Sequence, residues 1–245
     1  MKSTYETGHA KNVANLSKLI TQIELYDKYD PPVEALTVEN LTTLRDEARQ
    51  RIEEVEARRA ENKNAIHRRQ DLYRELNPLC TRVVNHLDIL GLSSGAQDRA
   101  RALNKRIQGS ATAKKVVMED GEDGMEETTV GISTSRQSFT QRAEHFSQLL
   151  TLIRTVDNYE PNEDDLKMEN LDNLLAEMNN ATTAVDQTEA ALNKALRLRN
   201  EVLYARNTGV YDRAMHVKKY VRSVYGSTSD QHSRVSGILF TMISK

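Results

Sequence analysis

Apolar residues recur at spacings of three and four along most of the chain, a pattern that predicts amphipathic helices. Two such segments, 13–23 and 139–153, are each followed by a sequence of tyrosine, acid and proline. The residue before a proline avoids the α-helical backbone conformation, so each helix is expected to end there in a tight corner. The corner residues are Tyr29, Asp30 and Pro31 in the first segment and Tyr159, Glu160 and Pro161 in the second.

A long segment without glycine or proline follows each corner, at 38–77 and at 168–208. At about 1.5 Å per residue, a helix of this length extends roughly 60 Å. Pro78 and Gly209 are expected to end the two long helices, because these residue types interrupt helical patterns.

A third helix is expected after each long helix, near 79–90 and 210–224. In the first half of the chain, a further short helix is expected to reach Ile107. The corresponding tail in the second half, 235–243, is compatible with either helix or strand.

The two halves also match each other in sequence. A shift of 130 positions aligns residues 16–50 with 146–180 and gives 13 identities over 35 ungapped positions. With one inserted residue, the match resumes at Leu72-Tyr73 over Leu203-Tyr204. Self-similarity at a fixed period indicates a copied structural unit. The sequence therefore predicts an all-α protein, a tandem duplicated helical bundle.

The expected organisation is a first helical repeat at 1–109 and a second at 136–245, related by approximate two-fold pseudosymmetry. The two long helices are expected to pack alongside one another and to share one core. Each repeat alone would otherwise leave an apolar stripe exposed to water.

The segment between the repeats, 110–135, has a different composition. Two β-capable runs, 114–118 and 127–132, flank an acidic turn with glycines, which predicts a β-hairpin insert. The turn 119–127 carries six carboxylates but lacks the ligand spacing of an EF-hand loop, so a solvated turn is favoured over a cation site. Its acidity also argues against the membrane-inserting hairpin of helical pore-forming toxins.

Four segments of the second half have a distinctive sequence: SFTQRAEHFSQLLTLI, YEPNEDDLK, RNEVLYARNTGVYDRAMHVKKYVRSVYG and SRVSGILF. In these segments the chain resembles a group of uncharacterised helical proteins from Bacteroidota. The resemblance extends over most of the chain and implies a duplicated helical fold. It carries over no activity, cofactor or site residue.

Composition and charge narrow the possible environments and partners. The chain has 34 basic and 36 acidic residues, a net charge of −2, whereas nucleic-acid-binding domains tend to be strongly basic. A single cysteine, Cys80, excludes an internal disulfide and suits a reducing compartment. No secretory signal and no apolar run of about 20 residues is present, so we expect a cytoplasmic protein without a membrane partner, with export lacking a cleaved signal left open.

Motifs for catalysis or metal binding are weak. Only His9 among the histidines has a glutamate three residues before it, as in carboxylate-bridged metal sites, and Gly8 and a place ahead of the first helix weaken this match. Surface or capping histidines, and no metal or cofactor, are therefore expected. Cys80 is expected to be a buried structural thiol rather than a nucleophile. No catalytic serine elbow, glycine-rich phosphate loop or paired-cysteine motif is present, so an enzyme is not expected.

Two candidate surfaces lie in the second repeat. Tyrosine is enriched in binding hot spots, which makes one tyrosine-rich set a candidate partner surface. Its members are Tyr204, Tyr211, Tyr220 and Tyr225. A candidate basic patch interleaves with these tyrosines, as in surfaces that stack nucleic-acid bases. It consists of Arg213, Lys218, Lys219 and Arg222.

Duplicated amphipathic helices without a catalytic motif favour a non-catalytic structural or protein-interaction protein, whose partner is another protein or a second copy. The alternative is a nucleic-acid-associated protein that uses the basic third elements of both repeats. A small-ligand binder, or an enzyme without a recognisable motif, is the third hypothesis.

Overall fold

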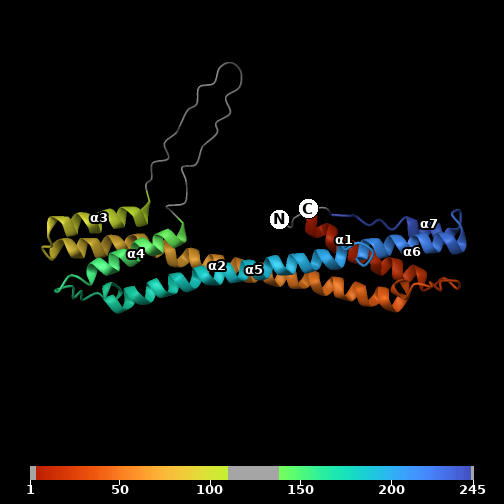
Figure 1. The fold of residues 1–245 in the computed structure, drawn as a ribbon, viewed down its shortest axis with the longest axis horizontal. Coiled ribbons are helices and arrows are strands. Elements are labelled where there is room, and N and C mark those ends of the chain that lie inside the picture. The colour runs from red at the N-terminus through yellow and green to blue at the C-terminus, as the bar shows by residue number, and fades with distance from the viewer. Residues whose placement is uncertain (1–3, 110–137, 244–245) are drawn as a thin grey trace, which may run out of the picture. The chain divides into compact units, whose positions relative to one another are not determined.

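The computed structural model describes residues 4–109 and 138–243. This part of the chain contains seven α-helices and no strand (Figure 1), which confirms the predicted all-α class for the described residues. The predicted β-hairpin and the acidic turn 119–127 lie outside these residues. None of the helices described is both long and apolar enough to cross a membrane.

The elements follow one another in an order close to that expected. They are α1 (Thr4–Ile23), η1 (Glu34–Leu36), α2 (Val38–Ile89), α3 (Ser94–Gln108), α4 (Phe139–Ile153), η3 (Asp164–Leu166), α5 (Met168–Tyr204), α6 (Val210–Tyr225) and α7 (Asp230–Ser236). Here η1 and η3 are short 3-10 helices that stand immediately before the long helices α2 and α5.

The expected end of the first long helix at Pro78 is wrong, because α2 continues through Pro78 to Ile89. A proline inside a helix removes one backbone hydrogen bond and costs about 3 kcal/mol. Apolar side chains on both sides of the proline lie in the same buried core, so ending the helix at Pro78 would disrupt their packing. These side chains are Tyr73, Leu76, Cys80 and Val83, none more than 2% exposed.

The second long helix does end near its predicted place, at Tyr204 rather than at 208. Asn207 adopts a positive φ of 65°, and its backbone N–H donates to the Asp212 carboxylate at 2.7 Å. Gly209 caps the next helix, α6, and a Cβ there would lie 2.7 Å from the Ala205 backbone nitrogen. The chain therefore turns at a point that only glycine fits, and α6 is a separate helix.

The tail is neither fully helical nor part of a sheet. Helix α7 covers only Asp230–Ser236, and residues 237–243 continue without regular secondary structure. The backbone leaves the helix with two hydrogen bonds, from Gly237 N–H to the Ser233 carbonyl at 3.2 Å and from Ile238 N–H to the Val235 carbonyl at 3.2 Å.

The chain divides into two compact units that differ from the predicted repeats 1–109 and 136–245. Unit 1 comprises Met1–Asn62 and Thr188–Lys245, and unit 2 comprises Lys63–Gln187. In unit 1, α1 packs against α6 and α7; in unit 2, α3 packs against α4. The first helix of each half therefore packs on the last helices of the other half.

Buried apolar residues accordingly form two clusters, one in each unit, in place of the single shared core that we expected. The large buried side chains of unit 1 include Leu16, Leu19 and Ile23 from α1, and those of unit 2 include Phe146 and Leu149 from α4. Two cores form because the partner of each amphipathic first helix is contributed by the other half of the chain.

Candidate functional site

Three of the four tyrosines of the predicted partner surface make hydrogen bonds inside unit 1. The Tyr204 hydroxyl lies 2.7 Å from Nδ1 of His9. The Tyr220 hydroxyl donates to the Asp30 carbonyl, and the Tyr225 hydroxyl accepts from the Lys28 backbone N–H at 2.8 Å. Tyr211 is half-buried at the start of α6. These tyrosines therefore hold the segment between α1 and η1 and the end of α5 in place.

Tyr220 and Tyr225 also pair with the tyrosines of the first corner. The Tyr29 and Tyr220 rings meet edge to face with centroids 5.4 Å apart, and the Tyr26 and Tyr225 rings do so at 5.6 Å. Such pairs contribute about 0.5–1.5 kcal/mol each beyond their buried area. Burial raises the pKa of both Tyr26 and Tyr29, and both hydroxyls donate, Tyr26 to the Gln231 carbonyl at 3.0 Å and Tyr29 to the Leu36 carbonyl at 2.7 Å.

Two large apolar side chains are exposed beside these tyrosines. Leu25 is 71% exposed and Val33 is 53% exposed, and both lie in the segment that joins α1 to η1. We call residues 24–33, together with Tyr220 and Tyr225, the unit 1 corner. The sequence pointed to Tyr220 and Tyr225 of this surface but not to Leu25 and Val33, because exposed apolar residues resemble core positions when only the sequence is considered.

The predicted basic patch is divided by the fold. Arg213 is half-buried and donates to the carbonyls of Thr208 at 3.0 Å and Ala35 at 2.7 Å. The Lys218 ammonium donates to the Ile238 carbonyl, lies 5.3 Å from the Phe240 ring centroid, and has a pKa lowered by burial. The remaining two residues, Lys219 and Arg222, are exposed on α6.

A group of buried polar residues on α1 was not predicted. His9, Asn12 and Asn15 are 3%, 2% and 7% exposed. The expectation that His9 is a surface or capping residue ahead of the first helix is wrong, because α1 begins at Thr4 and includes Gly8. The space that a Cβ at Gly8 would enter is filled by Ile243, whose Cδ1 atom would lie only 2.8 Å from it.

The buried asparagines bind the backbone of the C-terminal segment 237–243. Asn12 donates to the Thr241 carbonyl at 2.8 Å and accepts from the Thr241 N–H at 3.0 Å. Asn15 donates to the Leu239 carbonyl at 2.6 Å. The available sequence signal was two asparagines three residues apart on an otherwise apolar helix face, a position where an unpaired amide would be costly.

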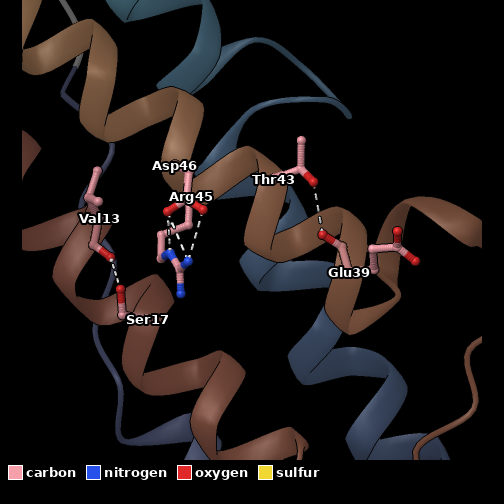
Figure 2. Close-up of polar contacts among 6 residues, drawn as sticks. All are labelled: Val13, Ser17, Glu39, Thr43, Arg45 and Asp46. Atoms are coloured by element: carbon pink, nitrogen blue, oxygen red, sulfur yellow. Dashed lines mark hydrogen bonds and ion pairs between the residues drawn. The ribbon is translucent and has the colours of Figure 1, made fainter.

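Several polar groups of α1 and α2 make local contacts within their own helices. Figure 2 shows Ser17 donating to the Val13 carbonyl at 3.3 Å and Thr43 donating to the Glu39 carbonyl at 3.1 Å. It also shows Arg45 bonded through two nitrogens to the carboxylate of Asp46. An exposed ion pair such as Arg45–Asp46 contributes little to stability.

The expected burial of Cys80 is confirmed, since the residue is 0% exposed. Desolvation by burial raises the pKa of the Cys80 thiol to about 12. The thiol is therefore neutral at physiological pH, and a neutral thiol is a poor nucleophile.

Within residues 4–109 and 138–243, no three histidine, cysteine or carboxylate side chains are close enough to hold a metal ion. Two features described above are the unit 1 corner and the contact of Asn12 and Asn15 with the C-terminal segment. Comparison of the chain with protein-family models, curated proteins and solved structures found no match.

Proposed function

We propose that this is a non-catalytic protein-interaction protein, built from a duplicated helical module, whose partner surface is the unit 1 corner. The observation that carries the proposal is the exposure of Leu25 and Val33 on a corner that the tyrosine pairs hold in one conformation. A preformed apolar surface binds a partner without paying for the ordering of its own side chains.

Comparison with the second corner supports this assignment. In both corners a tyrosine hydroxyl donates to a backbone carbonyl seven residues on, Tyr29 to Leu36 at 2.7 Å and Tyr159 to Leu166 at 2.9 Å. The positions aligned with Leu25 and Val33 are Thr155 and Glu163 in the second corner. The corner therefore folds without apolar residues at these positions, and their presence in unit 1 favours a binding role.

The duplication itself is part of the proposal. It is supported by the 13 identities over 35 positions and by matching hydrogen bonds at the two corners. A cytoplasmic location is proposed as well, and it depends only on the single neutral thiol of Cys80.

The test is affinity capture from the native cell with three forms of the full chain. The first is the unaltered protein, and the second carries Leu25→Asp and Val33→Asp. The third is a matched control, Ile89→Asp, which alters an apolar residue of unit 2 that is 78% exposed. Circular dichroism checks that all three forms retain their helix content.

We expect a partner that the unaltered chain and the Ile89→Asp control retain and that the double variant loses by at least tenfold. Equal retention by all three forms would remove the unit 1 corner as the partner surface. Salt-dependent retention of the chain on DNA would instead favour the nucleic-acid hypothesis.

A further inference from the structure

Unit 1 contains a cavity of about 350 Å³, lined by residues of α2, of the end of α5 and of the start of α6. Its lining includes three aliphatic side chains, Leu44, Leu198 and Val202, and its volume is within the range of small-molecule sites in proteins. Neither Leu25 nor Val33 lines this cavity, so it can bind a ligand whether or not the unit 1 corner is a partner surface.

Arg213 lines the cavity without a carboxylate partner. Its guanidinium is half-buried, donates to the backbone carbonyls of Thr208 and Ala35, and is in no ion pair with any residue that the structure describes. The aligned arginine of unit 2, Arg82, donates through both terminal nitrogens to the carboxylate of Asp165, the residue that aligns with Ala35. A charge partly removed from water is stabilised by a partner of opposite sign, and Ala35 supplies none.

The cavity also has one acidic group without a basic partner. Glu47 lies 4.0 Å from Arg51, which binds Glu54 at 3.0 Å as well, so the charge of Glu47 is offset. Glu201 lines the same cavity and, within the described part of the chain, is in no ion pair, not even with Arg213. One positive and one negative group are thus left to a ligand, which suits a molecule that carries both a carboxylate and an ammonium.

Unit 2 has a cavity at the aligned place, but with a different wall. Its volume is about 540 Å³, and the residues in the places of the three aliphatic side chains are Leu174, His67 and Asp71. Two of these three positions therefore accept polar side chains in the same helical arrangement. The aliphatic wall of unit 1 consequently favours a ligand with an aliphatic body.

We propose that the cavity of unit 1 binds a free α-amino acid with an aliphatic side chain. The carboxylate of this ligand binds Arg213 and its ammonium binds Glu201, both through charge-assisted hydrogen bonds. Its side chain lies against Leu44, Leu198 and Val202. Because acidic and basic side chains are equal in number around the cavity, a ligand with several negative charges is not favoured.

The first test is calorimetric titration of the full chain with free leucine and with two analogues. N-acetylleucine lacks the ammonium and leucinamide lacks the carboxylate. We expect leucine to bind saturably, one molecule per chain, and each analogue to bind roughly tenfold more weakly or worse, because it leaves one charged group of the site unpaired. No saturable binding of leucine would overturn the proposal, and so would equal binding of N-acetylleucine, which would indicate the carboxyl terminus of a peptide as the ligand.

The second test uses a matched pair of variants at Ala35, whose side chain does not line the cavity. Ala35→Asp gives Arg213 the carboxylate that Asp165 gives Arg82, and the corner of unit 2 folds with an aspartate at this position. We expect leucine to bind Ala35→Asp roughly tenfold more weakly or worse, because the new carboxylate competes with that of the ligand. Ala35→Asn has the same shape without the charge and is expected to bind leucine as the unaltered chain does.

Circular dichroism checks that both variants keep their helix content. Unweakened binding by Ala35→Asp, or an equal loss in both variants, would overturn the assignment of Arg213 as the carboxylate-binding group.

Discussion

Unit 1 and unit 2 have matching residues at their corners, but different residues at the start of α1 and of α4. Asn40 donates to the Glu34 carbonyl at 2.8 Å, and Asn170 donates to the Asp164 carbonyl at 2.6 Å. An arginine from the other half of the chain reaches each corner as well, but its partner differs. In unit 1, Arg213 donates to the backbone carbonyl of Ala35. In unit 2, Arg82 donates to the carboxylate of Asp165, the residue that aligns with Ala35.

The residues at the start of α1 and of α4 differ in chemical character. In unit 1, the His9 and Tyr204 rings lie 5.6 Å apart, and the aligned pair in unit 2 is Phe139 with Tyr73, at 4.7 Å. Asn12 aligns with Arg142, and both bind backbone groups: Arg142 donates to the Ile107 carbonyl in the last turn of α3, and Asn12 accepts from the Thr241 N–H beyond the end of α7. In unit 2, an aromatic pair and Arg142 thus join the helices, whereas in unit 1 the amides of Asn12 and Asn15 bind the C-terminal segment 237–243.

The comparison shows that similar helices can be held either to one another or to a segment without regular secondary structure. Arg142 donates to the carbonyls of Tyr73 and Ile107, both at 3.1 Å, and to the side chain of Asn77 at 2.9 Å, and so fixes helices to one another. Asn12 fixes a helix to a segment without regular secondary structure. Four measurements test whether the two units differ in this way.

The largest expected effect comes from emptying one core at a time. Phe146→Ala in unit 2 should lower the free energy of unfolding by about 3–5 kcal/mol, and Leu16→Ala in unit 1 by about 2–5 kcal/mol, because both side chains are fully buried. Hydrogen exchange should show the loss of protection mainly in the altered unit. Equal loss in both units would show that the two cores unfold together.

The second measurement compares the two closures directly. Arg142→Ala and Asn12→Ala each leave buried hydrogen-bonding partners unsatisfied. Each should lower the free energy of unfolding, measured in urea, by about 1–3 kcal/mol. Arg142→Ala should be the more damaging, because it also removes a cation from the Tyr73 ring, 5.2 Å away. A larger loss for Asn12→Ala would show that the contact with the segment 237–243 is the stronger closure.

The third measurement follows how the free energy of unfolding depends on pH through Cys80, a residue of unit 2. Burial raises the pKa of Cys80 from 9.0 to about 12, so the unfolded chain loses this proton before the folded chain does. The contribution of the neutral Cys80 thiol to the free energy of unfolding is therefore fully present below pH 9 and is lost as pH rises toward 12. The free energy of unfolding should fall by roughly 1 kcal/mol by pH 10. Stability measured from pH 8 to 10 should fall less steeply in Cys80→Val, and an unchanged slope would contradict this account.

The smallest effect tests the equivalence of the corners. Tyr29→Phe and Tyr159→Phe each remove one hydroxyl that bonds to a backbone carbonyl, at a cost of about 0.5–1.5 kcal/mol. Thermal unfolding should give equal losses for the two variants. Clearly different losses would weaken the case for a copied corner.

Local signals in the sequence determined most of the helices and their corners. Proline restricts the backbone of the residue before it, so Pro31 and Pro161 predicted the two corners, but the expectation that the helices end there is wrong, because α1 already ends at Ile23 and α4 at Ile153. Ser138 caps α4 by accepting from the Gln141 N–H at 3.2 Å, a bond between residues only three positions apart. The all-α class follows from such short-range preferences together with the spacing of apolar residues.

Contacts between distant parts of the chain set which helices pack together and where Pro78 and His9 lie. Pro78 lies inside α2 because buried residues on both sides of it stabilise the continuous helix. His9 is buried where it meets Tyr204, far away in sequence, whose hydroxyl lies 2.7 Å from the His9 Nδ1 atom. An amphipathic stripe records that a helix must be covered but not by what, so the pairing of α1 with α6 and of α4 with α3 depends on contacts between distant residues.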